Sequence, residues 1–320
     1  MKKFSAKLLL IALFYFVIFY PLELFLDKKY NNEYLICSKV QWVLNKKNVQ
    51  YDWVILGSSR ALNGVDPIEF SNLSEGKAIN IATSGSNFAE NFVLLQQFIK
   101  NGNKFKTLLL QADIYGLNSP NNYSHPFNEQ NMIHLFRKPD VQQVIKDYVN
   151  PIKFYLWKDI PYSRYMEYGF HYSLYKAVKG GYGCDSGEWD RTMGYEILQE
   201  KAKETEQKYS KKKEFQVNKK DLEYLNKIVE LCQANHIQVV LFCSPEYLPF
   251  VNQTQDKTKL FEFYNYFCQQ NHLPPFIYLH QSEKWNDKSF FKDETHINAK
   301  GVQEFTKDLF NALNQMKLSQ

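Results

Sequence analysis

Short apolar runs alternate along the chain with longer segments in which apolar residues recur every three to four positions. The runs are bounded by turn residues, which is typical of buried strands, at 52–57, 78–83, 106–113, 237–245 and 276–279. Helical spacing follows at 87–102, 219–236, 257–272 and 299–316. This alternation predicts an α/β fold of flavodoxin-like type, with three layers and a parallel sheet covered on both faces.

The alternation breaks off between residues 114 and 218. A connection of about 100 residues is too long for a loop, so this segment is expected to be an inserted, helical subdomain or lid. Its middle part, Phe154 to Tyr175, holds nine aromatic residues among 22. Two interpretations stay open: these rings pack the core of the insertion, or some line a sugar or acyl groove or rest on a membrane surface.

The N-terminal segment is the most apolar part of the chain. A 19-residue stretch, Leu8 to Leu26, is broken only by Pro21 and Glu23 and approaches the length of a membrane-spanning helix. No small-residue cleavage site follows, so residues 1–29 are predicted to be an uncleaved anchor rather than a cleaved signal or a core helix. Three lysines before the stretch favour a cytoplasmic N-terminus and an extracytoplasmic main domain.

These expectations divide the chain into an anchor, a stalk at 30–50 and an α/β domain at 51–320 that 114–218 interrupts. The net charge of +5, from 39 basic and 34 acidic residues, is ordinary and does not indicate a class of partner. The strongest basic run, Lys211 to Lys213, has acids interleaved around it and predicts a solvated helix face, so no nucleic-acid partner is expected.

The cysteines predict neither disulfides nor a metal site. There are five of them, and none shows CxxC spacing. Cys268 and His272 are four positions apart, but two such residues on an amphipathic helix are more typical of packing than of metal ligation. No cofactor or metal is expected.

Polar stretches follow the first three predicted strands. They read GSSR at 57–60, SGSN at 84–87 and DIYGLN at 113–118, and a fourth, DETHINAKG at 293–301, precedes the last helix. Ligands of an open parallel sheet bind beyond the carboxyl ends of its strands. Both ends of the chain should therefore contribute to one site at this rim.

Asp293 and His296 have the spacing that lets a carboxylate orient an imidazole. A histidine held in this way can activate a serine hydroxyl, and GSSR provides one at the same rim. By itself the pair also fits a helix-capping aspartate and a surface histidine. The serine-containing stretch makes the catalytic interpretation the better one.

These blocks together resemble the SGNH, or GDSL-like, hydrolase superfamily. The similarity lies in ILGSSRALNG at 55–64, in Gly85 of ATSGSN and in DETHINAKG, in the order the family shows. Within the superfamily, the chain is most similar to a membrane-anchored, extracytoplasmic branch whose first block reads GSS. That branch includes the D-alanyl transfer proteins of teichoic acid modification and acetylation factors of exopolysaccharide synthesis. The resemblance covers roughly 51–116 and 219–318.

The resemblance implies a role for each matching residue. Ser59 takes the position of the nucleophile, His296 that of the general base and acid, and Asp293 that of the orienting carboxylate. The backbone N–H groups of Ser59 and Gly85 would form the oxyanion hole. The family's third block normally adds an asparagine in a G-x-N-D sequence, which this chain lacks, leaving Asn87 or Asn118 as substitutes.

Two further charged residues have open assignments. Arg60 either binds an anionic group of the substrate or pairs with an internal carboxylate. Asp113, at the end of the third strand, is interpreted as a structural partner.

The resemblance implies a membrane-anchored serine esterase or O-acyltransferase that acts on acyl esters of a cell-surface glycan or polymer. A membrane-bound acyltransferase would be a suitable partner. The alternative is an inactive member of the fold, retained as a glycan-binding or assembly component of a membrane acylation complex, and the missing asparagine favours it.

Overall fold

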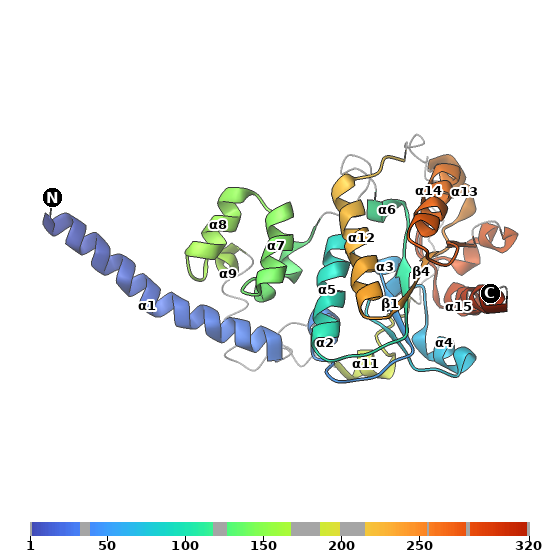
Figure 1. Ribbon diagram of the computed structural model, residues 1–320, viewed down its shortest axis with the longest axis horizontal. Coiled ribbons are helices and arrows are strands. Elements are labelled where there is room, and N and C mark those ends of the chain that lie inside the picture. Colours follow the sequence, from blue (N-terminus) through green and yellow to red (C-terminus); the bar gives the residue numbers. More distant parts are fainter. Residues whose placement is uncertain are drawn as a thin grey trace. The chain divides into compact units, whose positions relative to one another are not determined.

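The computed structural model describes residues 2–32, 39–117, 127–167, 186–198, 215–254, 256–279 and 282–318. Contacts divide the chain into two compact units, which are drawn with the sequence colours in Figure 1. The helical unit contains residues 1–45 and 128–186, and the sheet unit contains residues 46–127 and 187–320.

The sheet unit is built on five parallel strands in the order β2-β1-β3-β4-β5. Their bounds are β1 (Trp53–Leu56), β2 (Ala78–Asn80), β3 (Thr107–Gln111), β4 (Gln238–Cys243) and β5 (Ile277–Tyr278). This is the flavodoxin-like order of a doubly wound sheet. Since β1 has a strand on either side and helices above and below, all four of its residues are buried. The predicted α/β fold with a parallel sheet is confirmed.

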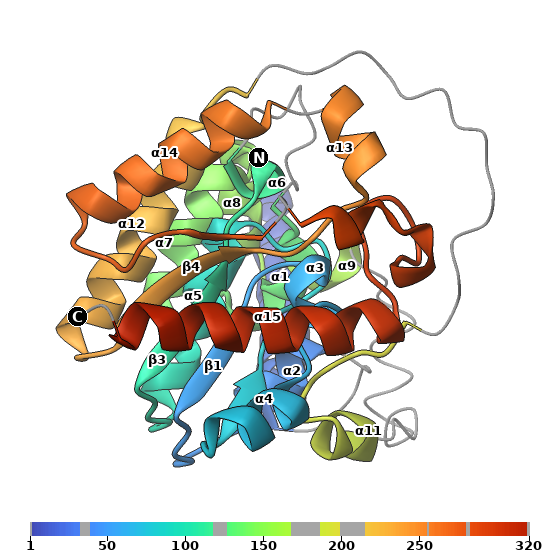
Figure 2. The ribbon, with the colours of Figure 1, turned by 90° about the vertical axis from the view of Figure 1, so that its right-hand side faces the viewer.

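Helices cover both faces of the sheet (Figures 1 and 2). On one face, α4 (Pro67–Ser74) contacts α15 (Ala299–Leu318), and a core that includes Ile55, Phe242 and Phe305 lies beneath them. On the other face, α5 (Phe88–Lys100) contacts α12 (Lys219–Ala234). Next to α12 lies α14 (Lys257–Gln270), whose C-cap carbonyl accepts a hydrogen bond of 3.3 Å from the Gln233 side chain.

Shorter helices complete this part of the chain. They are α3 (Ser59–Leu62), α6 (Ile114–Leu117), α11 (Ser186–Arg191), α13 (Leu248–Thr254) and the 3-10 turns η4 (Glu283–Asn286) and η5 (Lys288–Phe290). The amphipathic segments predicted to be helical correspond to α5, α12, α14 and α15. The sequence pattern did not single out α4, whose N-cap Asp66 accepts hydrogen bonds from the N–H groups of Ile68 and Glu69.

The helical unit combines the N-terminal helix with part of the long segment that the sequence sets apart. Its elements are α1 (Lys2–Asn32), α2 (Lys39–Leu44), η2 (Glu129–Asn131), η3 (Ile133–Leu135), α7 (Pro139–Tyr148), α8 (Pro151–Asp159) and α9 (Ser163–Glu167). Within α1, the segment Lys3–Lys28 is long and apolar enough to cross a membrane, and it contains an 18-residue window with a mean hydropathy of 2.3.

A buried ionic cluster joins α1 to the rest of the helical unit. The Arg164 guanidinium, fully buried, lies 2.6 Å from the Glu23 carboxylate and 2.7 Å from that of Asp27. Arg137 contacts the same two carboxylates at 2.8 and 3.2 Å. Since Glu23 and Asp27 are one helical turn apart, a single face of α1 presents both acids. Each of the two buried carboxylates therefore has two arginine partners within the helical unit.

The aromatic residues of this unit mainly form its core. Phe154, Trp157, Tyr162 and Tyr165 are at least 95% buried, whereas Tyr155 is 49% exposed. The four aromatics between 168 and 175, and His171 among them, lie outside the described residues. For the described rings, packing within the unit is therefore the main role.

Candidate active site

The turn after β1 requires glycine at its first position. Gly57 has a φ of +155°, and a Cβ there would lie 2.5 Å from the Cβ of Gln111. No larger residue fits both constraints. The Gly57 carbonyl accepts a 3.1 Å hydrogen bond from the Thr83 N–H, which connects the turn after β1 to the loop after β2.

The two serines of this turn have different environments. Ser58 is 5% exposed, and its hydroxyl donates to the Gln111 side-chain oxygen at 3.0 Å. Ser59 is partly exposed, and its Oγ lies 2.9 Å from Nε2 of His296. The sequence around these two serines does not distinguish them, but the fold brings only the hydroxyl of Ser59 into contact with His296.

The loop before α15 holds Asp293 and His296 in fixed geometry. A β-bridge pairs Phe291 with Ile297, and the Lys292 N–H donates to the His296 carbonyl at 2.8 Å. Nδ1 of His296 lies 3.0 Å from both carboxylate oxygens of Asp293. With its proton on Nδ1, the ring donates to Asp293 and its Nε2 can accept from the Ser59 hydroxyl.

Hydrogen bonds keep the Asp293 carboxylate ionised. Burial by itself would raise its pKa, but hydrogen bonds from His296 and Thr295 and the attraction of the imidazole outweigh burial and lower the pKa to about 2. The donors include the Thr295 N–H at 2.8 Å, the Thr295 hydroxyl at 3.0 Å and the His296 N–H at 2.9 Å. Thr295 was not singled out from the sequence.

A buried polar network supports the turn at residues 57–60, which we call the serine turn. The Gln111 side-chain oxygen accepts hydrogen bonds from the N–H groups of Ser58 at 2.9 Å and Ala61 at 3.0 Å, and its amide nitrogen donates to Asp113. Sequence reasoning missed Gln111, although a polar residue ending the apolar strand TLLLQ was the available signal. It lies beneath the turn because β3 pairs directly with β1.

Arg60 pairs with internal carboxylates, which was one of the two roles considered for it from the sequence. Its guanidinium lies 2.7 Å from Asp113 and 3.6 Å from Glu246, and it also donates to the Ser244 carbonyl. The residue is only 3% exposed. Asp113 is therefore a structural partner, as expected, and Arg60 connects the ends of β1, β3 and β4.

The backbone N–H groups of Ser59 and Gly85 have no hydrogen-bond acceptor within the part of the chain that the structure describes. Gly85 belongs to the turn that Thr83 and Ser86 attach to the Gly57 carbonyl. Asn87 caps α5, with its side-chain oxygen accepting from the N–H groups of Ala89 and Glu90. Asn118 lies outside the described residues.

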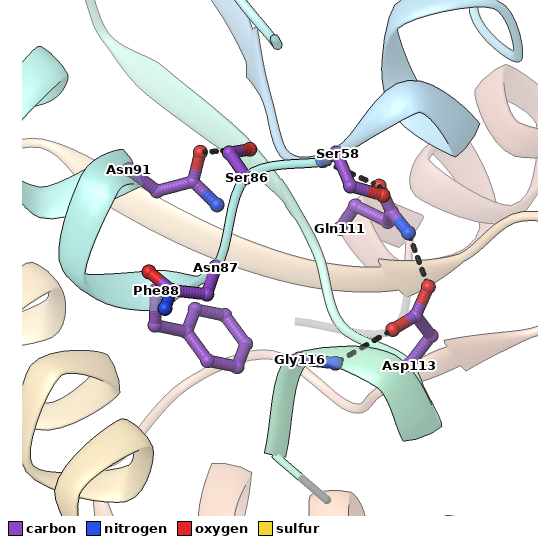
Figure 3. Close-up of a pocket in the computed structure, with 8 residues that line it drawn as sticks. All are labelled: Ser58, Ser86, Asn87, Phe88, Asn91, Gln111, Asp113 and Gly116. Atoms are coloured by element: carbon purple, nitrogen blue, oxygen red, sulfur yellow. Dashed lines mark hydrogen bonds between the residues drawn. The ribbon is translucent and has the colours of Figure 1, made fainter. Parts of the chain in front are cut away.

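A small cavity lined mainly by polar residues lies between the turn after β1 and the loop after β2 (Figure 3). Its volume of about 10 Å³ has room for little more than one water molecule. It is lined by Ser58, Ser86, Asn87, Phe88, Asn91, Gln111, Asp113 and Gly116. The cavity is too small for an acyl group, and Ser59 is not among its lining residues.

Among the described residues, no three histidine, cysteine, aspartate or glutamate side chains are grouped to hold a metal ion. Cys268, considered above with His272, is buried, and burial raises the pKa of its thiol to about 12. Such a thiol packs as an apolar group.

No protein-family profile and no curated protein matches this chain. Among solved structures, it is similar to the crystal structure of a "putative acylhydrolase" from Bacteroides fragilis NCTC 9343. The sequences are 13% identical, and the TM-score is 0.37 over 84% of this chain and 89% of that one. A likeness at this level supports no statement about substrate or mechanism.

Proposed function

We propose that this chain is a serine esterase or O-acyltransferase of the SGNH type that α1 anchors in a membrane. The observation that carries the proposal is the continuous contact from Ser59 through His296 to Asp293, with distances of 2.9 and 3.0 Å. Three residues whose order matches a nucleophile, a base and an orienting acid meet at the carboxyl edge of the sheet.

The first half-reaction follows from this geometry. The Ser59 oxygen attacks the carbonyl carbon of an acyl ester or thioester while His296 Nε2 takes the hydroxyl proton. Asp293 holds the Nδ1–H tautomer and stabilises the imidazolium that forms. Negative charge then develops on the carbonyl oxygen, and the N–H groups of Ser59 and Gly85 are suited to bind it since neither has another described acceptor.

Collapse of the tetrahedral intermediate breaks the bond to the leaving group. His296 returns its proton to the departing alcohol or thiol, and the acyl group remains on Ser59. In the second half-reaction the same nitrogen deprotonates water, for hydrolysis, or a polymer hydroxyl, for transfer. The two outcomes share the acyl-serine intermediate and differ only in the acceptor.

The substrate proposal combines the site with the N-terminal helix. The apolar stretch of α1 would keep the chain at a membrane, with the sheet unit on the extracytoplasmic side. Acyl esters of a cell-surface glycan or polymer are the substrates within reach there. A membrane-bound acyltransferase is the proposed partner that supplies the acyl group.

A fluorophosphonate probe tests the nucleophile directly, since it reacts with activated serines without requiring the natural substrate. Full-length protein in detergent should label and should hydrolyse p-nitrophenyl acetate, and Ser59→Ala should abolish both. Ser58→Ala is the matched control, because the neighbouring hydroxyl contacts Gln111 rather than the histidine. Its labelling should remain.

Two results would oppose the proposal. A folded parent protein that neither labels nor turns over the ester would favour the inactive, glycan-binding alternative. Labelling that persists in Ser59→Ala but disappears in Ser58→Ala would retain the enzyme class and overturn the residue assignment.

A further inference from the structure

One face of α8 exposes a group of apolar side chains. Ile152, Tyr155 and Leu156 are 73%, 49% and 50% exposed, and their spacing places them on one side of the helix. The opposite side carries Phe154 and Trp157, which are buried in the helical unit. The core of this unit therefore leaves an apolar helix face uncovered.

The exposed face continues toward the turn that follows α8. Ile160, in this turn, is 37% exposed. Asp159, which ends α8, is exposed on the same side of the helix, one turn beyond Tyr155 and Leu156, and bounds the face at its C-terminal end, while the exposed Lys158 lies at its side. An apolar face with charged residues at its margin is the pattern of a helix that lies in a membrane interface.

The same turn contacts the membrane-spanning stretch of α1. The Tyr15 hydroxyl donates to the Pro161 carbonyl at 2.8 Å, and the rings of Phe19 and Tyr162 have centroids 5.5 Å apart. In Figure 1, α8 and α9 lie nearer than α7 to the N-terminal end of α1. The uncovered face is thus continuous with the surface that would meet lipid.

The length of α1 sets the depth of this contact. A hydrocarbon core of about 30 Å requires about 20 helical residues, which is the distance from Phe4 to the buried, ion-paired Glu23. Tyr15 precedes Glu23 by eight residues, or about 12 Å along the axis. If the turn after α8 stayed outside the bilayer, the part of α1 between the charged Lys3 and Tyr15 would have to cross it, and from Phe4 on this part is only about 17 Å long.

The backbone of this turn is suited to a medium without water, where every polar backbone group needs an internal partner. The Ser163 hydroxyl lies 2.8 Å from the Leu156 carbonyl and 2.7 Å from that of Ile160. Tyr15 satisfies the Pro161 carbonyl, and the Tyr162 N–H donates to the Glu23 carboxylate. The carbonyls of Leu156, Ile160 and Pro161 and the N–H of Tyr162 are therefore already bonded where α8 ends.

We infer that α8 and the turn at residues 160–162 are embedded in the lipid bilayer beside α1, as an interfacial helix that forms a second membrane attachment. The inference rests on the anchoring role of α1 in the proposed function. Its occupant is the lipid of the bilayer, in the leaflet at the C-terminal end of the α1 span. The ionic cluster of Glu23, Asp27, Arg137 and Arg164 connects α1 to α9, which directly follows this turn.

Lipid-borne quenchers test this placement. Single cysteines at Ile152→Cys and Leu156→Cys, in a full-length chain carrying Cys37→Ser and Cys184→Ser, would be labelled with the fluorophore NBD. Cys232, Cys243 and Cys268 are buried, and the background chain measures any residual labelling. The labelled proteins are reconstituted in phosphatidylcholine vesicles with or without lipid carrying a doxyl group at acyl carbon 5.

Two reference positions make the result interpretable. Leu13→Cys, on the 57% exposed side chain of α1, reports the anchor itself. Gln143→Cys, on the exposed polar side of α7, reports a helix position in water. We expect doxyl lipid to quench the labels at 13, 152 and 156 with blue-shifted emission, and aqueous iodide to quench the label at 143.

Each other outcome is decisive. Quenching at 13 but iodide access at 152 and 156 would preserve the anchor and overturn the second attachment. No lipid quenching at 13 would remove the anchor and the inference together. Labels at 152 and 156 that resist both quenchers would show that a second copy or another protein covers the face, which also contradicts insertion into lipid.

Discussion

Gln111 offers the sharpest test of how the serine turn is supported, through the substitution Gln111→Met. The residue is 4% exposed, and methionine keeps its length while removing both polar atoms. The Ser58 N–H and the Ser58 hydroxyl, 2.9 and 3.0 Å from the Gln111 oxygen, would both lose this acceptor. The Ala61 N–H keeps the Ser58 carbonyl as a second acceptor at 3.0 Å and should lose little. The Asp113 carboxylate loses one charged hydrogen bond.

The expected loss follows from these contacts. One buried N–H without a partner costs about 1–3 kcal/mol, and a hydrogen bond to a charged group contributes about 1.5–3 kcal/mol. Since the turn can partly relax, we expect a total near 3 kcal/mol. For a domain of this size that corresponds to a fall in melting temperature of about 6–12 °C.

Thermal unfolding of the full-length protein in detergent, followed by intrinsic fluorescence, measures this effect. Gln238→Met is the matched control, because its side chain is exposed on β4 and the chemical change is the same. Ester hydrolysis should also fall in Gln111→Met, since the turn carries Ser59. Equal melting temperatures for the two variants would refute the supporting role of Gln111.

Three further changes probe the same region. Asp113→Asn removes the negative charge 2.7 Å from Arg60 but leaves that of Glu246 at 3.6 Å. The free energy of unfolding, measured by urea denaturation, should therefore fall by about 3 kcal/mol. Gly57→Ala places a Cβ 2.5 Å from the Gln111 Cβ at a residue with positive φ, so the free energy of unfolding should fall by about 2–4 kcal/mol. An unchanged free energy of unfolding would contradict the backbone conformation described for Gly57. Because the Asp293 pKa is lowered to about 2, its ionised form stabilises the fold above about pH 4 and loses that effect as the pH falls to about 2. The difference in the free energy of unfolding between the parent protein and Asp293→Asn should shrink as the pH falls over that range. A difference that stayed constant would contradict the lowered pKa of Asp293.

The strands and the longer helices could be predicted because each has a local signal. A strand such as β1, buried on both faces, is a continuous apolar run, and α5 shows apolar residues at helical spacing between its Asn87 cap and Gly102. The short helix α4 was not singled out, because its eight residues bury only Pro67 and Phe70. Too few apolar positions remain for a helical pattern to stand out.

The site was predictable only in part. Asp293 and His296 are close in sequence, so their spacing was visible, and the resemblance selected Ser59 over Ser58. The contribution of Gln111 depends on the pairing of β3 with β1, which no local pattern contains. The same is true of Asn80 at the end of β2, whose amide donates to the carbonyls of Ala61 and Val65 at 2.8 and 3.1 Å.

The distance along the chain between Ser59 and His296 has a consequence for biosynthesis. The two residues are 237 positions apart, and the Thr306 hydroxyl of α15 accepts a 3.1 Å hydrogen bond from the Asp66 N–H, just after the serine turn. During translation the proposed nucleophile, Ser59, emerges from the ribosome long before the proposed base, His296. A nascent chain, or one cleaved by a protease before α15, would carry Ser59 with an unactivated hydroxyl. Chemical competence would thus be acquired last, when α15 docks against α4.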